Sequence, residues 1–152
     1  MQTLEKIIPP PLVAGIIGLA MWGLSPAQPG QAVSLFVQIA TFTAALLGVI
    51  FGILGAMAFR QAKTTANPMK PEMASTLVDS GIYRVSRNPM YLGMVLLLLA
   101  WAIYLASALS LLGVVAYVLY MTRFQIIPEE EAMEKLFGQE YMVYKAKVRR
   151  WL

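Results

Sequence analysis

Two long stretches without any charged residue dominate the hydrophobic pattern of the chain. No Asp, Glu, Lys or Arg occurs between residues 7 and 59, and none occurs between residues 88 and 122. A membrane-spanning helix needs about 20 apolar residues to cross roughly 30 Å of hydrocarbon. Two charge-free stretches of this size indicate a polytopic membrane protein and do not fit the core of a soluble domain.

Turn residues and length divide these stretches into four predicted helices. Two prolines and a glycine between Ser25 and Gln31 mark a turn, which predicts spans at 7–24 and 32–59. One helix over the second stretch would measure about 52 Å at about 1.5 Å per residue, far more than the hydrocarbon thickness. We therefore expect a helical hairpin that turns around residues 106–108, with spans at 89–106 and 108–122.

The basic residues orient these spans. All twelve Lys and Arg residues lie in the first six residues or in two polar segments, 60–88 and 123–152. Four spans place all of them on one side, and the positive-inside rule puts that side and both termini in the cytoplasm. We expect one all-α integral-membrane domain over residues 1–152. Its small size and plain topology favour a bacterial inner membrane.

Composition narrows the chemistry that this chain can perform. The sequence contains no cysteine and no histidine. Disulfides and thiolate catalysis are excluded, and the commonest general base and metal ligand are missing, so we expect no metal site. Any reaction must use carboxylates, tyrosines, amides, arginines and a bound cofactor. All acidic residues except Glu5 lie in the two polar segments, where the chemistry is expected.

The first polar segment ends in a strong helix-start signal. Asn88 is expected to cap the helix, and Pro89 at the first helical position loses no N–H that is needed. The free N–H groups at such a start favour a carboxylate, and Arg84 and Arg87 strengthen that field. The same residues also fit a span that simply begins here, with its arginines among the lipid headgroups.

The second polar segment carries three consecutive glutamates, at 129–131. They follow Pro128, which suits the first turn of a new helix, where acidic side chains complement the dipole. Gly138 is expected to end that helix. One stripe of a following amphipathic helix would hold Tyr141, Tyr144, Val148 and Trp151. Such an acidic run is most often a solvated turn, but it leaves the last span on the same side as the Asn88–Pro89 start, which favours a binding site.

Two separated motifs resemble a known superfamily. Residues 81–83 (GIY) and 87–93 (RNPMYLG), followed by 129–130 (EE) and 137–144 (FGQEYMVY), are similar to the isoprenylcysteine carboxyl methyltransferase and phospholipid methyltransferase superfamily. The resemblance implies an all-helical membrane enzyme with short cytosolic helices forming a cofactor pocket. It also implies S-adenosylmethionine as the cofactor and S-adenosylhomocysteine as the product.

The resemblance also implies site residues. Cofactor contacts carry over to Ser75, Leu77, Val78, Tyr83, Asn88, Pro89, Tyr91 and Glu129. Ser75 and Asn88 stand where relatives carry histidine, so Asn88 can donate a hydrogen bond but cannot act as a base. The substrate arginine of the family falls at Gln125, with Arg123 two residues earlier, and we expect one of these two residues to position the substrate.

The methyl acceptor is left open by the sequence. A carboxylate acceptor needs no base at neutral pH, whereas an amine must lose a proton, and without histidine this slightly favours a carboxylate or thiol over a lipid amine. Two other classes fit the same pattern: a reductase-like membrane protein that binds a nicotinamide cofactor, and a non-catalytic helical membrane module. The expected partners are the lipid bilayer and a lipophilic or small-molecule acceptor, and no nucleic acid is expected.

Overall fold

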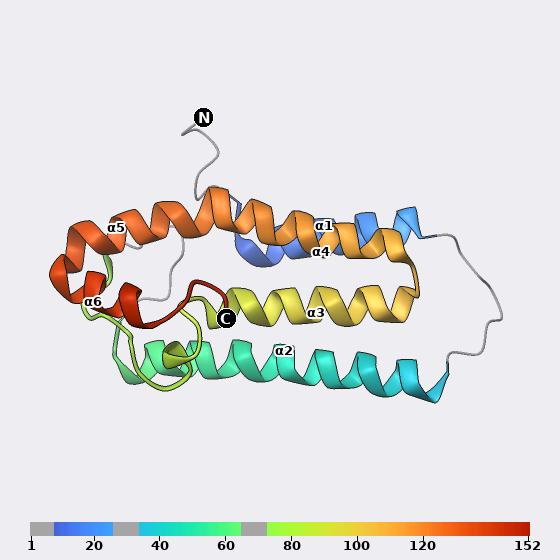
Figure 1. Cartoon of the computed structure of the whole chain (residues 1–152), viewed down its shortest axis with the longest axis horizontal. Helices are drawn as coiled ribbons and strands as arrows, with labels where there is room; N and C mark the ends of the chain where they lie inside the picture. Colours follow the sequence, from blue (N-terminus) through green and yellow to red (C-terminus); the bar gives the residue numbers. More distant parts are fainter. Residues whose placement is uncertain (1–7, 26–33, 65–72) are drawn as a thin grey trace.

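The computed structural model describes residues 8–25, 34–64 and 73–152. Regular structure in these ranges is entirely helical, which confirms the predicted all-α fold there (Figure 1). The elements are α1 (Pro10–Leu24), α2 (Leu35–Gln61), the 3-10 turn η3 (Gly81–Arg84), α3 (Pro89–Leu105), α4 (Ala108–Met121), the π-helical turn η4 (Thr122–Ile126), α5 (Ile127–Phe137) and α6 (Gln139–Lys147). The predicted turn at 26–31 and the predicted helix starts at 7 and 32 lie outside the described residues.

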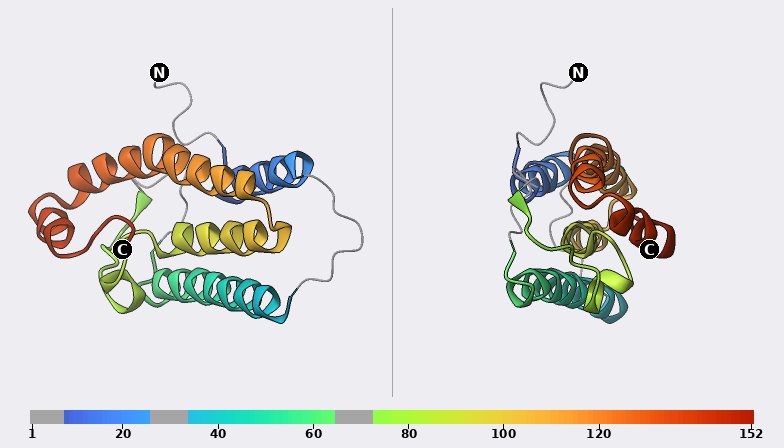
Figure 2. Two further views of the ribbon diagram at one scale, coloured as in Figure 1. Left: turned by 45° about the vertical axis from the view of Figure 1, so that its right-hand side comes forward. Right: turned by 90° about the vertical axis from the view of Figure 1, so that its left-hand side faces the viewer.

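Helix α3 occupies the centre of the bundle, between α2 on one side and the α1–α4 pair on the other (Figure 2). Its contact with α2 is close because glycines face each other. A Cβ atom placed on Gly48 would lie 2.8 Å from the carbonyl oxygen of Gly93, and one placed on Gly93 would lie 2.7 Å from that of Gly48. Small residues at a membrane helix interface let two backbones approach in this way, so α2 and α3 form the tightest pair of the bundle.

The bundle exposes apolar side chains over most of its surface. Helix α2 and the helical stretch Ala108–Phe137 are long and apolar enough to cross a membrane, yet only 17% and 28% of their most apolar windows are buried within the protein. Phe36, for example, is 79% exposed. Helices α1 and α3 are also apolar but shorter, with 15 and 17 residues. Apolar surface on this scale in a folded chain marks a membrane or interaction surface.

The predicted turn between the last two spans is confirmed in position. Helix α3 ends at Leu105 and α4 begins at Ala108. Ala106 adopts the left-handed conformation, with φ 48° and ψ 32°, which reverses the chain within two residues. Near the same end of the bundle, the Ser25 and Ser110 hydroxyl oxygens lie 3.0 Å apart, so that polar side chains join α1 to α4 there.

The predicted break before the three glutamates is wrong. The chain stays helical from Ala108 to Phe137, through α4, η4 and α5 (Figure 1). Pro128 cannot donate a backbone hydrogen bond, and its ring crowds the carbonyl group four residues earlier in an α-helix. The wider turn η4, in which the Ile127 N–H donates to the Thr122 carbonyl, accommodates the proline. The glutamates therefore lie within a helix and gain no support from a free helix start.

The last helix is shorter than the sequence pattern predicts. Chain direction changes at Gly138, whose φ of 52° and ψ of −123° fit glycine. Helix α6 then ends at Lys147, and Val148 is extended. Tyr141 and Tyr144 are buried on the predicted stripe, but Val148 and Trp151 are not part of the helix. Residues 148–152 instead run back towards the start of α3, as described below.

Candidate functional site

A pocket lies at the end of the bundle where the described basic residues gather. Here α2 and the α4–α5 helix extend past the start of α3, with residues 73–88 and α6 between them (Figures 1 and 2). Segments distant in sequence share the wall. Its residues are Phe59, Ala74, Thr76, Leu77, Val78, Tyr83, Arg87, Asn88, Met90, Tyr91, Ile126, Glu129, Glu130, Met133, Tyr141 and Tyr144.

Glu129 joins α5 to α3 across this pocket. Its Oε1 atom accepts a hydrogen bond from the Tyr91 hydroxyl at 2.6 Å and one from the Gln125 amide. Gln125 lies one helical turn earlier and is only 2% exposed. Tyr91 and Gln125 thus hold the Glu129 carboxylate in place on the pocket wall.

Three buried tyrosines form part of the pocket lining. Tyr83, Tyr141 and Tyr144 pack with Val78 into one buried cluster, and the Tyr144 hydroxyl donates to the Tyr83 carbonyl at 2.8 Å. Burial is the largest cause that raises the pKa of each of these three hydroxyls above its usual value of about 10. They stay neutral near pH 7 and act as hydrogen-bonding aromatic surfaces.

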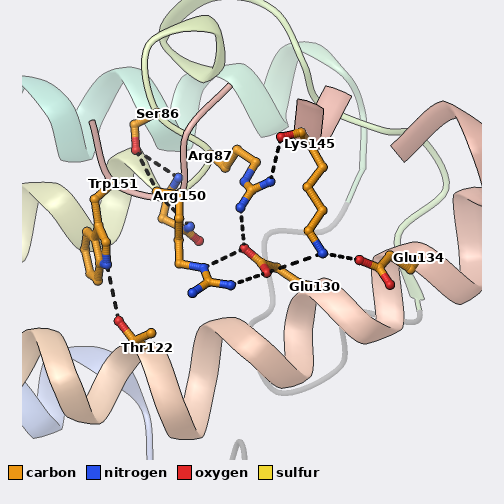
Figure 3. A network of polar contacts seen from close by, with 9 residues as sticks. Ser86, Arg87, Thr122, Glu130, Glu134, Lys145, Arg150 and Trp151 are labelled. Atoms are coloured by element: carbon orange, nitrogen blue, oxygen red, sulfur yellow. Dashed lines mark hydrogen bonds and ion pairs between the residues drawn. The ribbon is translucent and has the colours of Figure 1, made fainter. Parts of the chain in front are cut away.

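Glu130 is the centre of an ion-pair network that the sequence does not reveal (Figure 3). Its side chain is only 7% exposed. It accepts from Arg87 Nη2 at 2.8 Å and from Arg150 Nε and Nη2 at 2.9 and 2.8 Å. Lys145 Nζ lies 4.0 Å from the same carboxylate and also pairs with Glu134. The hydrogen bond from Arg150 to Glu130 is the main cause that raises the pKa of Arg150.

Residues 148–152 lie against the turn before α3. The Arg87 N–H donates to the Arg149 carbonyl at 3.0 Å, and the Asn88 side-chain amide donates to the Arg150 carbonyl at 2.9 Å. Trp151 Nε1 donates to Thr122 Oγ1 at 3.2 Å, which fixes this segment to η4 (Figure 3). The segment therefore ties together the two parts of the chain that form the pocket.

The structure brings six of the eight predicted cofactor residues to the pocket wall: Leu77, Val78, Tyr83, Asn88, Tyr91 and Glu129. Pro89 is buried at the start of α3 and is not among the lining residues. Ser75 is exposed, and its N–H donates to Thr64 Oγ1 at 2.9 Å. Asn88 occupies the N-cap position but its side chain makes no cap hydrogen bond. The predicted capping role of Asn88 is wrong, because its side-chain amide donates to the Arg150 carbonyl instead.

The two predicted substrate residues lie in different environments. Gln125 is buried behind Glu129 and contacts it directly. Arg123 is exposed and lies outside the pocket lining, with its guanidinium 5.5 Å from the centre of the Phe124 ring. Glu130, which lies beside Glu129 in sequence, is a site residue that the sequence pattern did not predict. Consecutive helical residues point about 100° apart, so that spacing alone would have placed the two carboxylates in different surroundings.

Exposed apolar helices, two of them long enough to cross a membrane, are features of a helical membrane protein, and the pocket lies at the end of its bundle. The family model described as phospholipid methyltransferase matches residues 36–140, from α2 to the start of α6. The chain therefore belongs to the phospholipid methyltransferase family, as the sequence motifs predict at superfamily level, and the family implies methyltransferase activity in general.

The chain is also similar to a shorter protein. An uncharacterized protein of Haemophilus influenzae (strain ATCC 51907 / DSM 11121 / KW20 / Rd) is 51% identical over 63 residues, which are 41% of this chain and the whole of that protein. No solved structure matches the chain.

Proposed function

We propose that this chain transfers a methyl group from S-adenosylmethionine to a lipophilic or small acceptor at the membrane surface. One observation carries the proposal. The two motif segments that resemble the methyltransferase superfamily, far apart in sequence, meet in one pocket, where Glu129 of the second accepts a hydrogen bond from Tyr91 of the first.

The pocket residues fit this cofactor. Apolar and aromatic side chains such as Phe59, Met90 and Met133 offer flat, adaptable surface to a nucleoside. The Glu129 carboxylate accepts hydrogen bonds from hydroxyl or ammonium groups and offsets a positive sulfonium. Among the described residues, no group of His, Cys, Asp and Glu side chains is arranged to hold a metal ion, and methyl transfer from a sulfonium does not need one.

Methyl transfer from a sulfonium requires the protein mainly to align the methyl donor with the acceptor. S-adenosylmethionine supplies a methyl group on a sulfonium, and the sulfur–carbon bond breaks with its electrons going to sulfur as the acceptor–carbon bond forms. The pocket aligns the reactants and excludes water, and Glu129 supports positive charge. For an amine acceptor, the departing proton goes to solvent or to a carboxylate of the pocket wall such as Glu129.

As the methyl acceptor, we favour a lipid amine over a carboxylate. Arg123, the expected contact for an anionic acceptor, lies outside the pocket lining. Arg87, which does line the pocket, is paired with Glu130. The family description names phospholipids, whose amine headgroups would reach the membrane face of the pocket.

We also propose four membrane spans, formed by α1, α2, α3 and α4, with both termini cytoplasmic. Every basic residue in the described ranges lies at the pocket end of the bundle or beyond it, and the 105–108 turn at the opposite end carries none (Figure 1). Because the chain has no cysteine, Ala108→Cys and Ala146→Cys give clean reporters. An impermeant thiol reagent should label the first in intact cells and the second only after permeabilisation; the reverse pattern would refute this orientation.

Ligand protection of the detergent-purified protein tests the methyltransferase proposal. At about a hundredfold excess over its dissociation constant, S-adenosylhomocysteine should stabilise the protein by about 2.7 kcal/mol, measured as a rise in melting temperature. Protection by NADPH alone would favour the reductase-like class instead. Protection by neither ligand in a folded sample would favour a non-catalytic helical module.

A further inference from the structure

An apolar groove lies between α1 and α3, in the part of the bundle proposed above to span the membrane. It is lined by residues of α1 between Ala14 and Trp22 and by residues of α3 between Met94 and Trp101, and its volume is about 530 Å³. Ligand sites in proteins usually measure about 300–1,000 Å³. A Cβ atom placed on Gly15 would meet no atom within 4 Å, and one placed on Gly18 would meet only Leu98, at 3.8 Å. The groove therefore has room for an apolar ligand.

One stripe of α3 leads from the functional pocket into this groove. Met90 lines the pocket, whereas Met94, Leu97 and Trp101 line the groove. Their spacing of four, three and four residues places all four side chains on one face of the helix. The Tyr117 hydroxyl donates to Met94 Sδ at 3.0 Å, which holds Met94 in place between Met90 and Trp101. The pocket and the groove therefore share one apolar wall.

The length of this stripe fits one leaflet of a bilayer. The eleven-residue step from Met90 to Trp101 within α3 rises about 17 Å at about 1.5 Å per residue, which is close to half of the roughly 30 Å of hydrocarbon. At the far end of the stripe, Trp101 Nε1 donates to the Gly18 carbonyl at 3.0 Å, and its indole stacks on Tyr104. A hydrocarbon chain of the leaflet on the pocket side has this length, whereas a spanning helix of a second copy would pack over the whole thickness.

We propose that the groove binds one hydrocarbon chain of the lipid acceptor, with the amine headgroup in the pocket and the chain end near Trp101. The proposal rests on the function and the spans proposed above, and it deepens them by naming how the acceptor is held. Binding of the chain would fix the headgroup beside the methyl donor. Helix α1 precedes residues 36–140, which match the family model, so this recognition uses a part of the chain outside that match.

Photo-crosslinking of the unmodified protein in detergent tests the position of the chain. Two phosphatidylethanolamine probes carry a diazirine in one chain, near the carbonyl carbon in the first and near the methyl end in the second. Mass spectrometry of peptides should place the label of the first probe mainly around Ala14 and Met94, and that of the second around Trp22 and Trp101. Labelling in the reverse order, or labelling spread evenly over the exposed apolar face of α2, would overturn the proposal.

Two further arms identify the occupant. A phosphatidylglycerol with the second probe's chain lacks the amine, and it should label the groove severalfold less than the phosphatidylethanolamine does. Equal labelling by the two lipids would mean that the groove takes any bilayer lipid, which overturns its assignment to the acceptor. Absence of label from the groove, together with a dimeric mass in native mass spectrometry, would assign the groove to a second copy of the chain.

Gly15→Leu and Gly23→Leu form a matched pair of variants. Both glycines lie on α1, and a Cβ atom on either meets no atom within 4 Å, but only Gly15 lines the groove. A leucine at position 15 would occupy the space proposed for the chain. Gly15→Leu should therefore reduce labelling of the groove by the second probe severalfold, and Gly23→Leu should leave it unchanged. Equal labelling in the two variants would refute binding of the chain beside Gly15.

Methyl transfer gives an independent readout. With S-adenosylmethionine present, the ratio of methylation rates for a long-chain and a short-chain phosphatidylethanolamine should fall severalfold in Gly15→Leu and stay constant in Gly23→Leu. Methyl transfer by a protein that is labelled evenly over its apolar surface would refute the groove alone. Ordered labelling of the groove without methyl transfer to any amine lipid would refute the proposed function, and the groove would remain a site for a lipid chain.

Discussion

The apolar bundle and the pocket end of this molecule are held together in different ways. In the bundle, α2 and α3 meet through facing glycines, and polar side-chain contacts are sparse, as in the bond from Trp101 Nε1 to the Gly18 carbonyl. At the pocket end, each charged side chain in the wall has a specific partner, as Glu130 has in Arg87 and Arg150. Backbone shape decides packing in the first region, and charge pairing decides it in the second. Substitutions should therefore destabilise the protein for different reasons in the two regions: steric overlap in the bundle and unpaired buried charge at the pocket end.

The largest effect is expected at the pocket end, where charge is buried. Glu130→Ala removes the carboxylate that compensates Arg87, and breaking a buried pair in this way costs roughly 3–5 kcal/mol of unfolding free energy. Thermal melting in detergent checks this. Glu131→Ala, an exposed neighbour, should change stability by less than about 0.5 kcal/mol. Similar small shifts in both variants would mean that the ion-pair network contributes nothing to stability.

Glu129 should affect ligand binding more than folding. Glu129→Gln should weaken binding of S-adenosylhomocysteine by roughly 1.5–3 kcal/mol, the range for a hydrogen bond that involves a charged group. Glu131→Gln should change it by less than about 0.5 kcal/mol, because that side chain is exposed. Calorimetric titration of both variants, after their melting curves are shown to match, gives the comparison. Equal small effects would remove Glu129 from the cofactor site.

In the bundle, one added methyl group tests the role of backbone contact. Gly48→Ala places a Cβ 2.8 Å from the Gly93 carbonyl oxygen, and overpacking of this kind costs roughly 1–3 kcal/mol. Gly52→Ala, on the same helix, meets no atom within 4 Å, and should be neutral or slightly stabilising, since alanine favours helix over glycine. If both variants melt like the unmodified protein, α2 and α3 are not held at close range.

The smallest effect concerns pH and the buried tyrosines. The raised pKa of Tyr141 means that the folded state keeps its proton when the unfolded state loses it, above pH of about 10. Stability from this group is therefore complete below that pH and falls as pH rises further, by up to about 1.4 kcal/mol per pH unit. Tyr141→Phe should reduce the slope of melting temperature against pH between about 10 and 11. An unchanged slope would mean that Tyr141 titrates normally in the folded protein.

The sequence predicts the elements of this fold better than their continuity. Charge-free stretches, the Asn88–Pro89 start and the turn at 106–108 rest on local rules of hydropathy and backbone preference, and helices begin and end there. The break at Pro128 was predicted by an equally local rule, but one wide turn absorbs the proline without ending the helix. Whether a proline ends a helix or is accommodated depends on packing around it, which one sequence does not display.

Prediction of the site was limited in a different way. Motif resemblance selects Glu129 and Tyr91, and the structure places both at one pocket. The motif includes Glu130 but implies no role for it, because the partner of Glu130, Arg150, belongs to a segment that crosses back over the pocket end after α6. Contacts of that kind depend on the path of the chain in space, whereas hydropathy and turn patterns describe only neighbours in sequence.

The wide turn η4 also sets the rotational register of everything after it. A π turn contains one residue more than an α turn, and each helical residue adds about 100° of rotation. Loss of one residue from this turn would convert it to an α turn and leave Glu129 facing Tyr91 and Glu130 facing Arg87, because the turn itself holds the extra residue. Loss of one residue after the turn, at Ile127 or Pro128, would instead bring Glu130 to the place of Glu129 and Glu131 to the place of Glu130. A run of three identical side chains thus makes the site tolerant of that deletion, whereas a one-residue insertion there would place Pro128 opposite Tyr91 and remove the acceptor of its hydroxyl.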